Sequence, residues 1–387
     1  MASQTIGIIV NGATGRIGST QHLANALIPI IEEGGLALGK DRLLPRLLLV
    51  GRDADRLAAV ARSSPKLADW TTDLDAALAD PAYAIFFDAA ATQQRVAVLE
   101  KAIAAGKHVY CEKPVAPTAA QALALLRQAQ SRGRKHGVVE DKIHLPGLQK
   151  LAALAKSGQL GRIVGFRLDF GWWVFDGSEQ PCQRPSWNYR AGGGGIVLDM
   201  YPHWRYVIES IIGRIVAVAS SAWTATPERI DERGQRYRVA VEDSAATLVE
   251  IEGGVFGSVG SSWATRVRRD DLLTLQVDGT KGSAVAGLHR CQVQSIAQTP
   301  AIAHFSVMQD IGADYREGWT EAPSLACYRN PYRVGWEAFL RHVAAGTPLG
   351  CDFTAGIRDV AFAEACHRSM QERRWIAFPA PGAEQMR

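Results

Sequence analysis

The stretch Thr5-Ile-Gly-Ile-Ile-Val-Asn-Gly12-Ala-Thr-Gly15-Arg-Ile-Gly18 decides the fold of the N-terminal part of this chain. Residues 5–10 form a short apolar run typical of a buried strand, and helical spacing follows from Ile17 to Glu33. Glycines between a strand and a helix let the backbone approach a pyrophosphate, and the helix N-terminus offers free N–H groups to phosphate. The spacing is G-x-x-G-x-x-G rather than G-x-G-x-x-G, so the position between strand and helix supports the motif more than the glycines alone.

Strand-like and helix-like segments continue to alternate up to about residue 133. This alternation predicts an α/β fold with a parallel sheet that helices cover on both faces. The predicted strands are 47–50, 84–88 and 108–111, and the predicted helices are 53–62, 95–105 and 118–133.

The pattern changes near Gly137 to Lys142, and long strands joined by hairpin signals such as Glu252-Gly-Gly254 follow. We therefore predict one domain over residues 1–138 and a second over 139–387, which contains an open, mostly antiparallel sheet. The second domain is expected to serve substrate binding and oligomerisation. It includes the C-terminal helices, which could pack back on the first domain, and 297–330 is expected to be a long loop. The predicted strands are 163–170, 215–223, 245–252, 255–263 and 272–278, and the predicted helices are 146–157, 331–345 and 354–371.

Composition excludes several classes of protein. The 387 residues carry a net charge of +4, and the Lys and Arg residues are spread along the chain rather than gathered in blocks. This favours an anionic ligand such as a dinucleotide over nucleic acid. The six cysteines show no C-x-x-C pair and no zinc-ligand spacing, so we expect free thiols, no metal site and a cytoplasmic location. The apolar segments predict no membrane span and no export signal.

The tripeptide Glu112-Lys113-Pro114 directly follows the predicted strand 108–111. Proline locks its own φ and pushes the preceding residue towards extended geometry, so the backbone direction at Lys113 is fixed. This arrangement would hold an ammonium group at a set point over a bound cofactor.

A second motif runs from Gly192-Gly-Gly-Gly195 to Asp199 and His203. The glycines predict a chain that passes close to a ligand or to other backbone. Pro202 fits the first turn of a helix that Asp199 could cap. Asp199 and His203 are then four residues apart on one face of this helix, a pairing that favours acid–base catalysis.

Together these motifs resemble the glucose–fructose oxidoreductase/inositol dehydrogenase (Gfo/Idh/MocA) family, and the similarity covers nearly the whole chain. The resemblance implies an N-terminal Rossmann domain with a doubly wound parallel sheet and a C-terminal α/β domain whose open sheet often forms oligomers, here a homodimer or homotetramer. It also implies NAD(P)-dependent chemistry on sugars or cyclitols. By position, Lys113, Asp199 and His203 match the catalytic residues of the family. The cofactor-binding residues expected are Gly12, Thr14, Gly15, Arg16, Ile17, Arg52, Glu112 and Lys113.

The choice between NAD and NADP is open at this point. The second predicted strand ends in Gly51-Arg52-Asp53. An acidic side chain at this position would bind the ribose 2′-hydroxyl of NAD, whereas an arginine accepts the 2′-phosphate of NADP. Arg52 leans towards NADP, and Asp53 could turn back to the ribose.

Aromatic and basic residues between the two motifs are expected to line one side of the substrate site, which we call the substrate wall. Tryptophan faces stack on sugar rings, and arginine forks bind anionic groups. Lys142 and the arginines, including Arg205, hint at an anionic or glycosidic substrate. The substrate-binding residues expected are Lys142, Trp172, Arg184, Trp187, Arg190 and His203.

Three segments depart from the usual family pattern. Ala91-Thr-Gln-Gln-Arg95 replaces a Thr-Pro-Asn type of turn with a histidine, Glu140-Asp-Lys142 replaces an Asn-Arg pattern, and Met200-Tyr-Pro202 replaces a glycine-containing stretch. These changes lie at the rims of the cofactor and substrate sites, so they affect the expected substrate more than the expected fold.

The function predicted first is hydride transfer between a nicotinamide and a hydroxyl-bearing carbon of a small carbohydrate-like substrate. His203 would be the general base, Lys113 would stabilise the developing alkoxide, and Asp199 would orient the imidazole or bind a neighbouring hydroxyl. One alternative is an NAD-dependent glycoside hydrolase that works by transient oxidation, elimination, hydration and re-reduction. The other is a dinucleotide-binding regulator without turnover, which would have no need of an acid–base pair.

Overall fold

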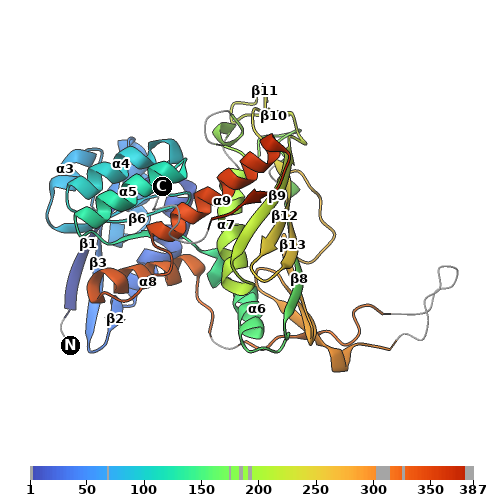
Figure 1. The fold of residues 1–387 in the computed structure, drawn as a ribbon. Helices are drawn as coiled ribbons and strands as arrows, with labels where there is room; N and C mark the ends of the chain where they lie inside the picture. Colours follow the sequence, from blue (N-terminus) through green and yellow to red (C-terminus); the bar gives the residue numbers. More distant parts are fainter. Residues whose placement is uncertain are drawn as a thin grey trace.

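The computed structural model describes residues 3–67, 69–173, 176–182, 186–190, 194–301, 314–324 and 327–379. Two sheets organise these residues (Figure 1). Sheet A lies in the N-terminal part, and sheet B lies in the C-terminal part, and helix α9 (Phe353–Glu372) runs from one to the other.

Sheet A has the order β2-β3-β1-β5-β6-β7, with β4 paired to β3. Every pairing is parallel except that of β2 with β3. Strand β1 pairs with β3 on one side and β5 on the other, so the strand order reverses at β1, which is where α/β sheets bind ligands. The predicted doubly wound sheet is therefore confirmed. Its strands are β1 (Ser3–Asn11), β2 (Leu36–Leu38), β3 (Asp41–Val50), β4 (Trp70–Thr71), β5 (Tyr83–Asp88), β6 (His108–Cys111) and β7 (His136–Val138).

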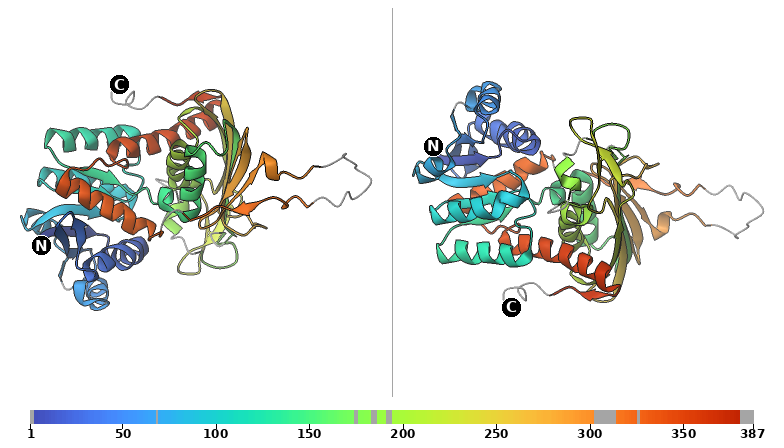
Figure 2. Two further views of the ribbon diagram at one scale, coloured as in Figure 1. Left: turned by 90° about the horizontal axis from the view of Figure 1, so that it is seen from below. Right: turned by 90° about the horizontal axis from the view of Figure 1, so that it is seen from above.

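Helices cover both faces of sheet A (Figure 2). Neighbouring residues of β1 point to opposite faces, so Ile8 belongs to one apolar core and Ile9 to the other. Helix α8 (Pro331–Ala345) returns from the end of the chain and adds Trp336 to the first core, where it packs beside η1 (Ile17–Leu27). The other helices of this part are α1 (Ile28–Glu32), α2 (Ala54–Arg62), η2 (Pro65–Leu67), α3 (Leu74–Ala79), α4 (Thr92–Ala104) and α5 (Ala119–Ser131).

Sheet B has the order β17-β16-β15-β14-β8-β13-β12-β9-β18. Only β8 and β13 pair in parallel, which confirms a mostly antiparallel sheet. The strands are β8 (Ile163–Gly171), β9 (Ile215–Trp223), β12 (Ser244–Ile251), β13 (Val255–Ser262), β14 (Leu273–Gly279), β15 (Gly282–Ala286), β16 (Cys291–Ser295), β17 (Thr320–Glu321) and β18 (Ile376–Ala377).

The two faces of sheet B differ. Helices α6 (Pro146–Lys156), α7 (Ile196–Ile211) and α9 cover the face turned towards sheet A, as Figure 2 shows. In the described part of the chain, no helix covers the opposite face. That face exposes Leu248 on β12 and Phe256 on β13, each about half accessible to solvent. A hairpin of β10 (Glu228–Ile230) and β11 (Arg236–Arg238) lies apart from both sheets, and the short helices η3 (Lys142–His144), η5 (Ser186–Tyr189) and η6 (Ile296–Gln298) lie in connections.

The sequence-based prediction missed mainly the short elements. Strands β2, β4 and β18 have only two or three residues, which is too few to show an alternating pattern. The segment 297–330, predicted as a loop, contains β17, which extends sheet B by pairing with β16. The boundary at residues 138 and 139 remains a prediction.

A buried charge cluster holds the two parts of the molecule together. Arg205 of α7 donates hydrogen bonds to Asp359 of α9 and to Glu140 just after β7, both at 2.7 Å. Glu209 accepts hydrogen bonds from Arg205 and from Arg358. Burial raises the pKa of Glu140 to about 8 and that of Asp359 to about 6. A proton on Glu140 would leave the carboxylates of Asp359 and Glu209 against the guanidinium groups of Arg205 and Arg358, so burial favours a cluster without net charge.

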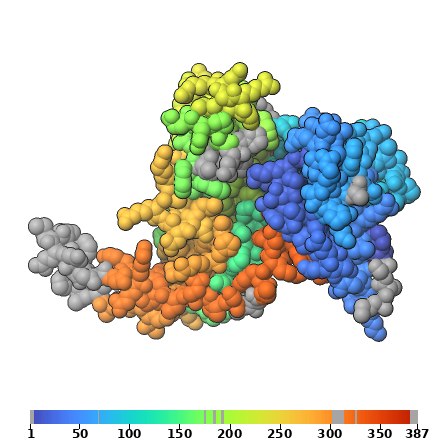
Figure 3. Space-filling view, turned by 180° about the vertical axis from the view of Figure 1, so that it is seen from behind, coloured from blue at the N-terminus to red at the C-terminus, as the bar shows by residue number. Residues whose placement is uncertain are grey.

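The space-filling view shows the blue N-terminal part lying against the green and orange segments of the rest (Figure 3). Among the described residues, no helix combines the length and the apolar character needed to cross a bilayer.

Candidate active site

The glycine turn lies at the carboxyl end of β1, beside the point where the strand order reverses. Gly12 has a φ of +78°, and a Cβ there would come within 2.7 Å of the backbone of Ala89. A Cβ on Gly18 would meet the carbonyl oxygen of Gly12 at 2.4 Å, so this glycine lets η1 start close against the turn. The turn therefore has the close-packed shape that suits a pyrophosphate at the start of a helix, and bound NAD(P) would supply a hydride acceptor here.

The end of β3 brings three side chains to the same edge of the sheet. Asp53 caps α2 by accepting the N–H of Arg56 at 3.0 Å, so its carboxylate is engaged with the helix. The guanidinium of Arg56 donates to the carbonyl oxygen of Thr14 at 2.8 Å and links α2 to the glycine turn. Arg52, directly before Asp53 in the sequence, lies exposed.

Lys113 joins the two halves of the candidate site. It follows β6 and precedes Pro114, with a cis peptide bond between them. Its Nζ donates to the main-chain oxygen of Asp199 at 2.7 Å and to the Asp199 carboxylate at 3.0 Å. The two side chains are mostly buried. The structure thus brings together residues that lie 86 positions apart in the sequence.

The neighbouring Glu112 links the Lys113 segment to η1. Its carboxylate accepts the N–H of Lys113 at 3.1 Å and lies 2.9 Å from Nε2 of the buried His22 in η1. Trp336 of α8 donates to Nδ1 of His22 at 3.0 Å, which assigns the His22 proton to Nε2 and directs it to Glu112. A role of Glu112 in contacting the cofactor remains a prediction.

Arg95 fixes the other side of the Lys113 segment. This buried side chain donates to the carbonyl oxygen of Pro114 at 2.6 Å, to Asp88 at 2.8 Å and to the carbonyl oxygen of Ala90 at 2.8 Å. Asp88 also accepts the amide of Asn11 at the end of β1. One guanidinium therefore ties together the carboxyl ends of β1, β5 and β6. The sequence marked Arg95 only as a departure from the family pattern, and its partners could not be found without the fold.

Helix α7 begins earlier than predicted, at Ile196, so Asp199 lies in its first turn and Pro202 lies in its interior. The prediction that Asp199 caps the helix is wrong. Glu242, from the loop before β12, accepts the N–H of Val197 at 3.2 Å and supplies the negative charge at the helix N-terminus.

The glycines before this helix are needed for close approach. A Cβ on Gly194 would lie 1.8 Å from the carbonyl oxygen of Asn188, and Gly195 has a φ of +103° against the Glu242 side chain. Gly192 and Gly193 lie outside the described residues.

His203 is buried on α7, in contact with groups that the sequence did not single out. Its Nδ1 lies 2.6 Å from the hydroxyl of Tyr206 and 3.8 Å from Oδ1 of Asp141. Lys142 forms a 2.5 Å ion pair with the other oxygen of Asp141. Burial opposes ionisation of Asp141, but Lys142 and Lys113 outweigh it, so the pKa of Asp141 lies below its ordinary value. Only the spacing of Tyr206, three residues after His203, could have indicated this contact from sequence.

The predicted substrate wall is only partly within the described structure. Arg184 lies outside the described residues. Trp187 is 42% exposed, and Trp172 is partly buried against the core of sheet B. Arg190 stacks on Tyr237 and lies 3.6 Å from Asp231. Because Arg205 belongs to the buried charge cluster, the suggestion that it contacts an anionic substrate is wrong.

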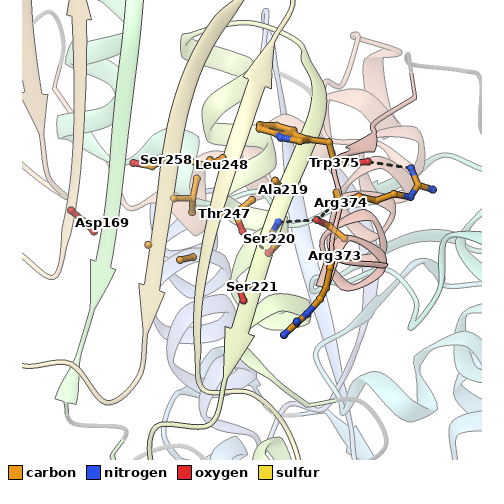
Figure 4. Close-up of a pocket in the computed structure, with 14 residues that line it drawn as sticks. Asp169, Ala219, Ser220, Ser221, Thr247, Leu248, Ser258, Arg373, Arg374 and Trp375 are labelled. Atoms are coloured by element: carbon orange, nitrogen blue, oxygen red, sulfur yellow. Dashed lines mark hydrogen bonds between the residues drawn. The ribbon is translucent and has the colours of Figure 1, made fainter. Parts of the chain in front are cut away.

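A hollow of about 580 Å³ lies elsewhere, on the face of sheet B that no described helix covers (Figure 4). It is lined by side chains of the central strands, including Leu248 and Ser258, and by Trp375 before β18. Lys113, Asp199 and His203 take no part in its lining. The contact of Lys113 with Asp199 instead joins the end of β6 to the first turn of α7.

Comparison with known proteins identifies the family of this chain. A model described as the oxidoreductase family with an NAD-binding Rossmann fold matches residues 40–139, and the GFO/IDH/MocA C-terminal domain matches residues 148–285. A D-xylose dehydrogenase of Paenarthrobacter nicotinovorans is 43% identical over 96% of this chain and 97% of its own. This chain belongs to the Gfo/Idh/MocA family. It is an NAD(P)-binding oxidoreductase.

Other members of the family are more distant. A levoglucosan dehydrogenase of Pseudarthrobacter phenanthrenivorans is 24% identical over 98% of this chain and 99% of its own. A solved structure of levoglucosan dehydrogenase in complex with NADH and L-sorbose has a TM-score of 0.78 at 23% identity, covering 98% of this chain and all of that one. This similarity supports the two-sheet fold described above.

We expect Arg95→Lys to reduce kcat. Lysine keeps the buried charge but cannot donate in three fixed directions, so the Pro114 carbonyl and with it Lys113 would shift. Misplacement of a reacting group by about 1 Å costs up to roughly 100-fold, and we expect a loss of at least about tenfold in steady-state kinetics.

The matched control is Lys107→Arg. Lys107 is also a buried cation, but it binds the carbonyl oxygens of Asp80 and Tyr83 at the opposite edge of the same sheet. This variant should lower the melting temperature and leave kcat unchanged. Equal destabilisation of both variants with unchanged kcat would show that Arg95 serves only the fold.

Proposed function

We propose that this oxidoreductase oxidises a hydroxyl-bearing carbon of a neutral monosaccharide to a carbonyl, with His203 as general base. The observation that carries the proposal is the contact of Lys113 with Asp199, four residues before His203 on α7. A lysine held beside a histidine-bearing helix suits an alcohol oxygen that loses its proton and gains negative charge.

Each group has a distinct role in this proposal. The imidazole of His203 accepts the hydroxyl proton, and the Lys113 ammonium donates a hydrogen bond to the same oxygen as charge develops. Asp199 positions the ammonium by accepting a hydrogen bond from it. The glycine turn binds the pyrophosphate of the cofactor.

Two observations support a neutral sugar over an anionic glycoside. The described cations expected in the substrate wall are already paired with carboxylates, Lys142 with Asp141 and Arg190 with Asp231. In addition, the relative that is 43% identical is named a D-xylose dehydrogenase. A pentose or hexose in its ring form is therefore the substrate class we propose.

The first test is turnover on a panel of sugars that includes D-xylose, with NAD or NADP as acceptor. We expect reduced cofactor to accumulate in proportion to oxidised sugar. Lys113→Ala should lower kcat by roughly 100-fold or more, because a charged donor to the reacting oxygen is lost. Lys101→Ala, which removes a surface lysine paired with Asp75, is the control and should retain full activity.

The same assay tests the two alternatives. Release of aglycone from a glycoside with trace NAD and without lasting absorbance of NADH would favour the hydrolase. Binding of the dinucleotide without turnover on any sugar would favour the regulator. Unchanged turnover in Lys113→Ala would refute the proposed site.

We further propose that NADP is the preferred cofactor. The carboxylate of Asp53 is engaged in capping α2, while Arg52 is exposed at the end of β3. This arrangement supports recognition of a 2′-phosphate by arginine over recognition of a ribose hydroxyl by a carboxylate.

Arg52→Ala should therefore raise KM for NADP by about tenfold or more and leave KM for NAD unchanged, because a charge-assisted hydrogen bond contributes about 1.5–3 kcal/mol. Arg62→Ala, at the other end of α2, should change neither constant. An equal effect of Arg52→Ala on both cofactors would contradict the preference.

We propose that the open face of sheet B binds a second copy of this chain, giving a homodimer or homotetramer. Leu248, Phe256 and the nearby Trp375 form an exposed apolar group there, and Phe256 and Trp375 pack edge to face. The cytoplasm remains the expected location, since the six cysteines are free thiols.

Light scattering after size exclusion checks the assembly. The wild type should elute as a dimer or tetramer, and the double variant Leu248→Glu/Phe256→Glu should shift to the monomer because charge is placed in the apolar contact. Trp70→Glu, an exposed apolar residue of sheet A, should leave the mass unchanged. A monomeric wild type would contradict the proposal.

A further inference from the structure

The contacts of His203 indicate which of its two ring nitrogens carries the proton. Tyr206 follows His203 by three residues on α7, and its ring stands at 90° to the imidazole. Its hydroxyl lies 2.6 Å from Nδ1 of His203 and 3.4 Å from Oδ1 of Asp141. The N–H of Lys142 also donates to this hydroxyl oxygen, at 3.2 Å. Tyr206 therefore stands between a histidine and a carboxylate.

The protonation states of Tyr206 and Asp141 restrict the directions of the hydrogen bonds around His203. Burial raises the pKa of Tyr206 well above its ordinary value, so the hydroxyl keeps its proton. The pKa of Asp141 lies below its ordinary value, so Asp141 is a carboxylate that only accepts hydrogen bonds. The single Tyr206 proton points either to Asp141 or to Nδ1 of His203.

The negative charge of Asp141, 3.8 Å from Nδ1, favours a proton on that nitrogen. His203 then donates from Nδ1 to Tyr206, and Tyr206 donates to Asp141. In this tautomer the lone pair is on Nε2, which is the form a general base requires.

We propose that Asp141 and Tyr206 are positioning residues that hold His203 in the Nε2-basic tautomer and stabilise its imidazolium form during sugar oxidation. The inference rests on the proposed function, because it assigns partners to the same base. In the oxidation step, the hydroxyl proton of the sugar passes to Nε2 as the C–H bond gives its hydride to the bound cofactor and the C=O bond forms. The positive charge that results on His203 is balanced by Asp141.

Other charged and titratable groups face the same region. Lys142 and His144 lie on η3, Lys113 follows β6, Asp199 and Arg205 lie on α7, Tyr332 lies on α8, and Asp359 lies on α9. Of these, Lys142 and Tyr332 contact Asp141 itself, and Arg205 is bound to Asp359 and Glu140. None of the substitutions below changes any of these groups.

The test measures kcat/KM for the sugar against pH in two variants and one control. Tyr206→Phe removes the hydroxyl and keeps the ring, and Asp141→Asn removes the charge and keeps the shape. Both should lower kcat at pH 7 by roughly ten- to a hundredfold, with KM for the sugar little changed, since general-base catalysis contributes about 10²–10⁴-fold.

The pH profile separates catalysis from packing. The acidic limb of kcat/KM reports the pKa of the base, and the Asp141 carboxylate raises that pKa by favouring the imidazolium. In Asp141→Asn the limb should therefore move to lower pH, by about one unit. In Tyr206→Phe the charge stays, so the limb should move less than in Asp141→Asn.

The control is Tyr201→Phe, on the same helix. Tyr201 is equally buried, but its hydroxyl bonds Thr247 of β12 and faces sheet B. The Tyr201→Phe variant should lose stability as Tyr206→Phe does, and it should keep both kcat and the pH profile of the wild type.

Three results would overturn the inference. They are an unshifted acidic limb in Asp141→Asn, a loss confined to KM, and a kcat in Tyr206→Phe equal to that of Tyr201→Phe. A wild type without turnover on any sugar would instead refute the proposed function, so the two failures are distinguishable.

Discussion

The site depends on one ion pair, between Lys113 after β6 and Asp199 in the first turn of α7. It joins the segment that follows sheet A to the helix that carries His203, the base in the proposed function. Both partners are themselves fixed. Arg95 and Glu112 hold the Lys113 segment, and Glu242 fixes the start of α7. Because the two side chains are largely buried, removal of either would leave a charge without its partner in a region of low dielectric.

The charges of the neighbouring residues Glu140 and Asp141 are also set by their surroundings. Lys142 and Lys113 hold the pKa of Asp141 below its ordinary value, whereas burial raises the pKa of Glu140, its neighbour in sequence. One of these carboxyl groups therefore contributes negative charge beside His203, and the other contributes a hydrogen bond to the Arg205 cluster between the two sheets. The two adjacent residues therefore have different purposes: Asp141 positions His203 in the inference above, and Glu140 is structural.

The sequence predicted what depends on local pattern. The glycine turn, the alternation of strands and helices and the restraint at Pro114 identified sheet A and placed Lys113 at its edge. The predicted start of α7 is too late because Glu242, whose side chain accepts an N–H of the first turn, comes from a loop more than 40 residues later. Arg95, His22 and Asp141 were missed as site residues for the same reason, since their partners lie far away in the chain. Arg205, which looked like an anion-binding residue, is buried among carboxylates that only the fold brings near.

A crystal structure of the enzyme with its dinucleotide and a sugar tests the central claim most directly. The account predicts that Nζ of Lys113 and the imidazole of His203 both lie within hydrogen-bonding distance of one hydroxyl oxygen of the sugar, at the carboxyl edge of sheet A. A sugar bound in the hollow on the open face of sheet B, or contacts of the two side chains with different oxygens, would contradict it.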